Sequence, residues 1–239
     1  MPRRARLDFP GLLHHVMARG IEGAVIFHDN DDREEFLRRL SQNVADGRAR
    51  LFAWVLMSNH FHLLLRPETV PLSTIMRRLL TGYAVWHNRR HSRKGHLFQN
   101  RYKSIIAEQD PYFLELVRYI HLNPIRAGIV KEMSELDRYP YSGHSVIMGN
   151  HKFKPQDVHG VLEFFGKGTG RARKEYRLFT AAGIEKGVRE DLRGGGLIRS
   201  AGGRENLDQR RCEGPALGDE RILGSTPFVE EVLKGHERR

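Results

Sequence analysis

Two adjacent strands are predicted in the middle of the chain, and they constrain its fold most strongly. Residues 51–57 form a nearly continuous apolar run, which is typical of a strand buried on both faces. After a Ser-Asn turn, residues 60–65 alternate between histidines and large apolar side chains. Side chains two residues apart in a strand share a face, so His60 and His62 lie opposite Phe61. We therefore expect Phe61 to face a core of helices and the histidines to lie on the open face of a sheet.

The other predicted elements lie before and after this pair of strands in the sequence. Asn30 is expected to cap the first helix, and Asp110 the third, where a proline follows the cap. The order of elements predicts an α+β, ferredoxin-like sandwich, in which an antiparallel central sheet carries its helices on one face. Apolar spacing and turn signals predict further strands at residues 12–19, 24–27 and 98–106, and helices at residues 31–45, 73–90 and 111–122.

The character of the sequence changes near residue 149. We expect residues 1–148 to form one domain, and residues 149–239 to form a basic, irregular or partly helical extension. This extension would bind DNA or be partly disordered. Its polar, arginine-rich sequence has glycine clusters at residues 166–170, 194–196 and 202–203. Short helices are predicted at residues 156–165, 172–183 and 227–233.

Charge and cysteine content narrow the class of protein. The 239 residues carry a net charge of +11, with a sequence pI of about 10.1. Such an excess favours a polyanion partner, nucleic acid first and an anionic membrane surface second, although it could also serve solubility alone.

The single cysteine, Cys212, excludes an internal disulfide and a cysteine-rich zinc site, and it fits a reducing compartment. With no signal-like or membrane-spanning apolar run, we expect a soluble cytoplasmic protein that binds no membrane.

The two histidines of residues 60–65 are the first candidate site. Two imidazoles on one strand face lie close enough to bind a single metal ion, and histidine is the commonest ligand for such ions. The alternative is a pair of ordinary half-buried histidines, which chance would produce in a chain with 13 of them.

The helix at residues 111–122 supplies the second candidate. Tyr119 lies beside the apolar stripe of this helix, and Asn123 follows one turn later on the same side. A hydroxyl at the edge of that stripe could point at a reacting phosphate, and an amide oxygen could bind a hard metal ion. The alternative is a packed aromatic residue with its hydroxyl at the surface. Tyr112 competes for the same role on spacing alone.

A third group of side chains lies at strand and helix ends. The group includes arginine and lysine side chains, which can position phosphates, and an aromatic side chain, which can stack on an unpaired base. The alternative for each cation is a solvated surface charge. The group consists of Arg19, Gln99, Asn100, Arg101, Tyr102, Lys103 and Arg126.

Several ordered blocks of sequence resemble the HUH single-tyrosine transposases, and most closely their REP-associated branch. Residues 54–62, Trp-Val-Leu-Met-Ser-Asn-His-Phe-His, resemble the metal-binding strand of that family. Residues 118–128, Arg-Tyr-Ile-His-Leu-Asn-Pro-Ile-Arg-Ala-Gly, resemble its tyrosine-bearing helix. Further similar blocks occupy residues 15–20, 96–102 and 139–143, so that the resemblance covers residues 5–146.

The resemblance implies a DNA transposase that cleaves and rejoins single-stranded hairpin DNA. His60, His62 and Asn123 would bind Mg²⁺ or Mn²⁺, and residues 1–148 would form the catalytic domain. Tyr119 would attack the phosphate, leaving a free 3′-hydroxyl and a 5′-phosphotyrosine. The third ligand in relatives is often glutamine, which is one methylene longer than Asn123. Contacts to DNA would come from Arg19, Arg101, Lys103 and Arg126.

Three other functions remain open at this point. One is a non-catalytic DNA-binding regulator on the same fold, and another is a metal-dependent phosphodiesterase that uses water as its nucleophile. The third is a structural RNA-binding protein. The sequence also leaves open whether the protein is a monomer or a homodimer.

Overall fold

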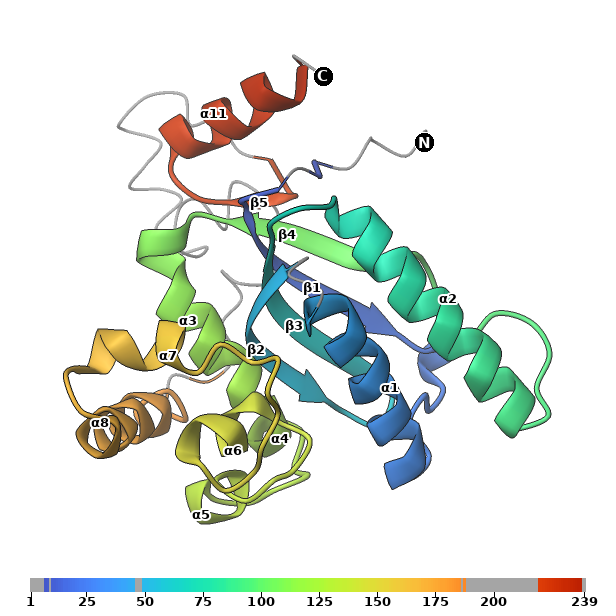
Figure 1. Cartoon of the computed structure of the whole chain (residues 1–239), viewed down its shortest axis with the longest axis horizontal. Coiled ribbons are helices and arrows are strands. Elements are labelled where there is room, and N and C mark those ends of the chain that lie inside the picture. Colours follow the sequence, from blue (N-terminus) through green and yellow to red (C-terminus); the bar gives the residue numbers. More distant parts are fainter. Residues whose placement is uncertain (1–6, 9, 46–48, 186, 188–218, 238–239) are drawn as a thin grey trace.

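A five-stranded sheet with the order β2-β3-β1-β4-β5 forms the centre of the molecule (Figure 1). The structure is a computed structural model that describes residues 7–8, 10–45, 49–185, 187 and 219–237. The first four strands pair antiparallel with their neighbours, and the fifth pairs parallel with β4 at the edge. The strands are β1 (Leu13–Arg19), β2 (Ala49–Leu56), β3 (His60–Pro67), β4 (Lys103–Ala107) and β5 (Ile222–Leu223).

Three long helices follow strands β1, β3 and β4. They are α1 (Asn30–Asn43), α2 (Leu72–Arg90) and α3 (Gln109–His121). Further helices follow: α4 (Asn123–Arg126), α5 (Met133–Leu136), α6 (Gly143–Met148), α7 (His159–Leu162), α8 (Thr169–Ala181) and α11 (Thr226–Glu237). Two 3₁₀ turns are η1 (Ile21–Gly23) and η3 (Glu163–Phe165). No helix in the described part of the chain is long and apolar enough to cross a membrane.

Helices cover both faces of the sheet. On one face, α1 and α2 bury Phe36 and Leu79 against Phe61 of β3. On the other face, α3 packs Leu116 of its apolar stripe in the same core as Val55 of β2. The predicted α+β class is confirmed, but the expectation of helices on one face is wrong. Because β2 is apolar on both faces and α3 has its own apolar stripe, a second layer of helices is needed to bury both.

Three local predictions also need correction. Residues 24–27 form no strand; instead, the backbone N–H groups of Ile26 and Phe27 both donate to the carbonyl oxygen of Ser58. The strand predicted at residues 98–106 begins only at Lys103, and Phe98 forms an isolated bridge with Gly20. The cap of α1 is Asp29, which accepts from the backbone N–H of Asp32, and α3 begins at Gln109 without a side-chain cap. Asn30 and Asp110 therefore lie inside their helices.

The register of the sheet decides which functional side chains share a face. Met17 of β1 lies opposite His62 of β3 and opposite Lys103 of β4, and Arg19 lies opposite His60. Residues paired across antiparallel strands point to the same face. Histidines and cations from three strands are thus brought together on the face that α3 covers.

The region after residue 149 begins with helices that pack on the main core. Leu162 of α7 and Tyr176 of α8 belong to the same buried cluster as the apolar stripe of α3. These elements and α11 lie within or across the predicted helical stretches. Residues 188–218 lie outside the described residues, and with them the predicted glycine clusters at residues 194–196 and 202–203 and Cys212.

Later parts of the chain pair along the outer strand β2 and along β4. At the β2 edge, Leu56 donates from its backbone N–H to the carbonyl oxygen of Tyr141, and Asp157 donates to that of Leu51. At the β4 edge, the two residues of β5 pair with Ile106 and Ala107.

Candidate active site

A cavity of about 600 Å³ opens on the sheet face beside α3. Six of the eight predicted site residues line it: Arg19, His60, His62, Arg101, Lys103 and Tyr119. The described residues that line the cavity include no aspartate or glutamate, so their three cations give it a positive character. Its other lining residues are Met17, Ala18, Asn59, Gln99, Asn100 and Ile105.

The two strand histidines form one end of the arrangement. The ring centroids of His60 and His62 lie 5.3 Å apart, with 81° between the ring planes. Nδ1 of His60 lies 2.7 Å from Oδ1 of Asn59, whose amide nitrogen donates to the carbonyl oxygen of Gly23. Since an amide oxygen can only accept, His60 donates from Nδ1, and this tautomer gives Nε2 the lone pair that could bind a metal ion.

His15 of β1 is a site residue that the sequence reasoning missed. Its Nε2 lies 2.9 Å from Nδ1 of His62, and the two rings stack with centroids 5.2 Å apart. His15 pairs with Leu64, so it is the diagonal neighbour of His62 on the same face. The available signal was the alternation of His15, Met17 and Arg19 along β1, which becomes informative only when the pairing register is known.

Tyr119 reaches the histidines from α3. Its side chain is buried, lines the cavity, and meets the ring of His15 edge-on at a centroid distance of 5.8 Å. The centroid of His62 lies 6.1 Å away in a similar arrangement. Tyr112, the competitor on spacing, packs at the margin of the core and does not line the cavity. The structure therefore brings a phenol and two strand imidazoles, distant in sequence, to one basic cavity.

Asn123 and Arg126 lie just past the end of α3. Nδ2 of Asn123 donates to the carbonyl oxygens of Tyr119 and Ile120, at 2.9 and 3.2 Å, and satisfies groups that a helix end leaves unpaired. Asn123 is buried and does not line the cavity. The guanidinium carbon of Arg126 lies 5.1 Å from the centroid of the Tyr119 ring, so this cation is stacked on the tyrosine.

The rim of the cavity is tied together by backbone hydrogen bonds. Gly20 donates to the carbonyl oxygen of Asn59 at 2.9 Å, and Gln99 donates to that of Arg19 at 3.0 Å. A Cβ atom on Gly20 would lie only 2.1 Å from the carbonyl oxygen of Ala24. The close turn after β1 therefore requires glycine, and it holds Arg19 beside the turn that precedes His60.

Two comparisons with known proteins gave a match. Residues 10–123 match the family model described as IS200-like transposase. A solved structure of a REP-associated tyrosine transposase bound to a REP hairpin matches with a TM-score of 0.50 and 19% identity. That match covers 64% of this chain and 90% of the solved chain, and it shows a shared fold. No curated protein was found to match the sequence.

Proposed function

We propose that the chain, whose residues 10–123 match the family model described as IS200-like transposase, cleaves and rejoins single-stranded hairpin DNA through a covalent link to Tyr119. The observation that carries this proposal is the convergence of Tyr119, His60 and His62 on one basic cavity. The solved transposase of similar fold is bound to a REP hairpin, which supports a DNA hairpin as the substrate class.

In this proposal the histidines hold a divalent ion, Mg²⁺ or Mn²⁺, which when bound polarises the scissile phosphate. The donor set fits, because the bond from His60 to Asn59 orients the lone pair of Nε2 outward from the turn. His15 fixes the ring of His62 in the manner of an outer-shell partner. Asn123 is the proposed third protein ligand through Oδ1, and because it is buried outside the cavity lining, its side chain would have to turn toward the histidines.

The chemical step proposed for Tyr119 is a phosphoryl transfer. Its phenolic O–H gives up its proton to solvent as the oxygen forms a bond to phosphorus and the bond to the 3′ oxygen breaks. The 3′ oxygen takes up a proton from solvent and leaves as a 3′-hydroxyl. The 5′-phosphotyrosine conserves the energy of the phosphodiester, so a different 3′-hydroxyl can reverse the step and complete strand transfer. The cation of Arg126 over the ring would stabilise the negative charge on the phenolic oxygen during these steps.

The remaining cations are proposed to hold the DNA backbone. Arg19, Arg101 and Lys103 line the same cavity as the proposed nucleophile, where phosphates flanking the cut would lie. Residues 1–148 would form the catalytic domain. The basic extension at residues 149–239 would add contacts to DNA outside the cavity.

A covalent capture experiment tests the proposed function. The protein would be incubated with Mg²⁺ and a pool of labelled hairpin oligonucleotides whose stems and single-stranded flanks are randomised, and then run on a denaturing gel. We expect a protein–DNA adduct that requires metal and disappears in Tyr119→Phe. The matched control, Tyr112→Phe on the same helix, should retain it.

The rival functions give different results in the same assay. A phosphodiesterase that uses water would cleave the oligonucleotides without an adduct and would tolerate Tyr119→Phe. A DNA-binding regulator would retain the hairpins on a native gel but would neither cleave them nor form the adduct. Either pattern would overturn the proposal.

A further inference from the structure

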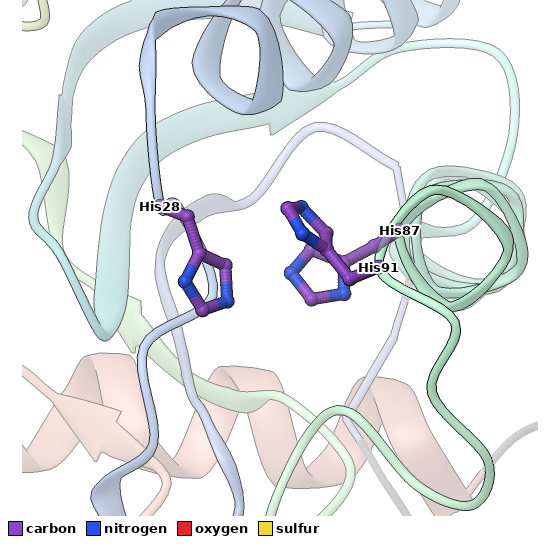
Figure 2. A group of neighbouring side chains, drawn as sticks. All are labelled: His28, His87 and His91. Atoms are coloured by element: carbon purple, nitrogen blue, oxygen red, sulfur yellow. The ribbon is translucent and has the colours of Figure 1, made fainter.

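Three histidines meet on the opposite side of the sheet from the cavity. His28 lies in the loop before α1, and His87 and His91 lie one turn apart at the end of α2 (Figure 2). The potential ligand atoms of the three side chains all lie within 4.8 Å of one another. The ring of His91 is central, with centroids 4.5 Å from His28 and 4.4 Å from His87.

The burial of His87 distinguishes this cluster from chance neighbours. Its side chain is fully buried, and neither ring nitrogen has a hydrogen-bond partner within the described part of the chain. Buried polar atoms without partners are rare and costly, so each instance calls for an explanation. Figure 2 shows the ring of His87 directed toward the other two imidazoles. A metal ion at this point would give one of these nitrogens a partner.

The carboxylate of Asp32 contacts two members of the cluster. Asp32 is buried, and its oxygens lie 2.9 and 3.1 Å from Nε2 of His91. A histidine that binds a metal through one nitrogen commonly donates the other N–H to such a carboxylate. Asp32 also accepts from the backbone N–H of His28 at 2.7 Å, so one carboxylate fixes two members of the cluster. Nδ1 of His91 would then be its coordinating atom.

We propose that His28, His87 and His91 bind one zinc ion, with water as the fourth ligand. Three neutral imidazoles are a typical set for zinc, whereas Mg²⁺ prefers oxygen ligands. Tetrahedral zinc places its nitrogen ligands about 3.3 Å apart. The three rings would therefore move slightly together on binding.

The zinc ion would stabilise the loop that contains His28, and this loop contacts the candidate active site. The segment before His28 is bonded to the turn between β2 and β3, because Ile26 and Phe27 donate to Ser58 at 2.9 and 3.0 Å. Zinc at the triad would join this segment to the end of α2. The site differs from the proposed catalytic one in its residues, its face of the sheet and its preferred metal.

The test uses zinc alone and an untagged full-length protein that carries His60→Ala and His62→Ala. These two changes remove the two histidines proposed to bind the catalytic ion. We expect this background to bind one equivalent of Zn²⁺ in a calorimetric titration and to melt at a higher temperature with zinc. Mg²⁺ should produce neither effect. Cobalt substitution should give the visible spectrum of a tetrahedral site.

Adding His28→Ala to the background should weaken zinc affinity at least tenfold. The His28 side chain is exposed, so its removal should leave the metal-free protein folded. His96→Ala, at another exposed histidine beyond α2, is the matched control and should leave zinc binding unchanged. A second variant, His87→Leu, should abolish zinc binding. The proposal is overturned if the background binds no zinc, or if His28→Ala binds it as tightly as the background.

Discussion

Nε2 of His15 lies 2.9 Å from Nδ1 of His62, and the planes of the two stacked rings differ by 25°. The contact joins β1 to β3, and both rings also meet the ring of Tyr119. A proposed metal ligand, a proposed nucleophile and a third histidine are therefore packed as one unit. The orientation of His62 depends on a residue 47 positions earlier in the chain.

Replacing His15 should weaken metal binding at the proposed catalytic site without removing any proposed ligand. Outer-shell partners of metal-bound histidines typically contribute about 10- to 100-fold in affinity or activity. His15→Ala should raise the Mn²⁺ concentration needed for half-maximal adduct formation by about that factor, and His15→Gln should recover part of the loss. Thermal melting would confirm that both variants fold. An unchanged Mn²⁺ dependence in His15→Ala would contradict a positioning role.

Arg126 should affect the chemical step more than DNA binding. Its guanidinium lies over the Tyr119 ring, outside the set of side chains that line the cavity. We expect Arg126→Gln to slow single-turnover adduct formation about tenfold, which corresponds to about 1.4 kcal/mol in the activation free energy. Hairpin affinity should change less, and Arg126→Lys should restore part of the rate. A loss confined to affinity would show that Arg126 only binds phosphate.

The cavity cations should contribute to the salt dependence of DNA binding. Each phosphate contact to single-stranded DNA contributes about 0.7 to the slope of log affinity against log salt concentration. Arg101→Gln should reduce that slope by about this amount in anisotropy titrations at several salt concentrations. Lys131→Gln removes an exposed cation in the loop before α5, outside the cavity and outside the basic extension, and serves as the control. Equal reductions in the two variants would argue against a specific role for the cavity.

The stability of the fold should fall in mild acid. Burial lowers the pKa of His14 from 6.5 to about 4, so the unfolded chain takes up a proton at a pH where the folded chain does not. Stability should therefore be constant above about pH 6.5 and decline toward pH 4, with His14 contributing a loss of roughly 3 kcal/mol. Burial lowers the pKa of His121 and His144 too, which acts in the same direction.

Urea unfolding at a series of pH values measures this decline. His14→Gln keeps a polar side chain beside Ser104, whose hydroxyl lies 2.9 Å from Nδ1 of His14, but it removes the titrating group. Its stability should depend less steeply on pH between 6.5 and 4 than that of the unmodified protein. Identical slopes in the two proteins would contradict the assignment to His14.

The parts of the site that were predictable are those encoded in one segment. His60 and His62 share a face because strand periodicity requires it, and Tyr119 falls beside a helical stripe that is visible in the sequence. His15 could not be recognised in this way, because its contact with His62 depends on the register between two strands. The position of Asn123 depends on how α3 ends, where helix carbonyls compete for its amide.

The sequence predicted the helices of the fold but not how they pack on the sheet. Periodicity located the long helices within a few residues, but it carried no information on which face of the sheet α3 would cover. The caps illustrate the same limit, since Asp29 and Asn30 are both good capping residues and only the chain geometry selects Asp29. His87 and His91 have visible helical spacing, yet the approach of His28 is purely tertiary.

The segments that pair along β2 and β4 restrict how copies of this protein could associate. Backbone groups at sheet edges readily recruit strands from other molecules, which leads to continuous sheets and fibrils. Here Tyr141 and Asp157 occupy positions along β2, and β5 occupies positions along β4. A second molecule could add a strand at those positions only by displacing these segments. At those positions, pairing of two copies would thus be expected to use helices or loops, which would leave the pairing along β2 and β4 intact.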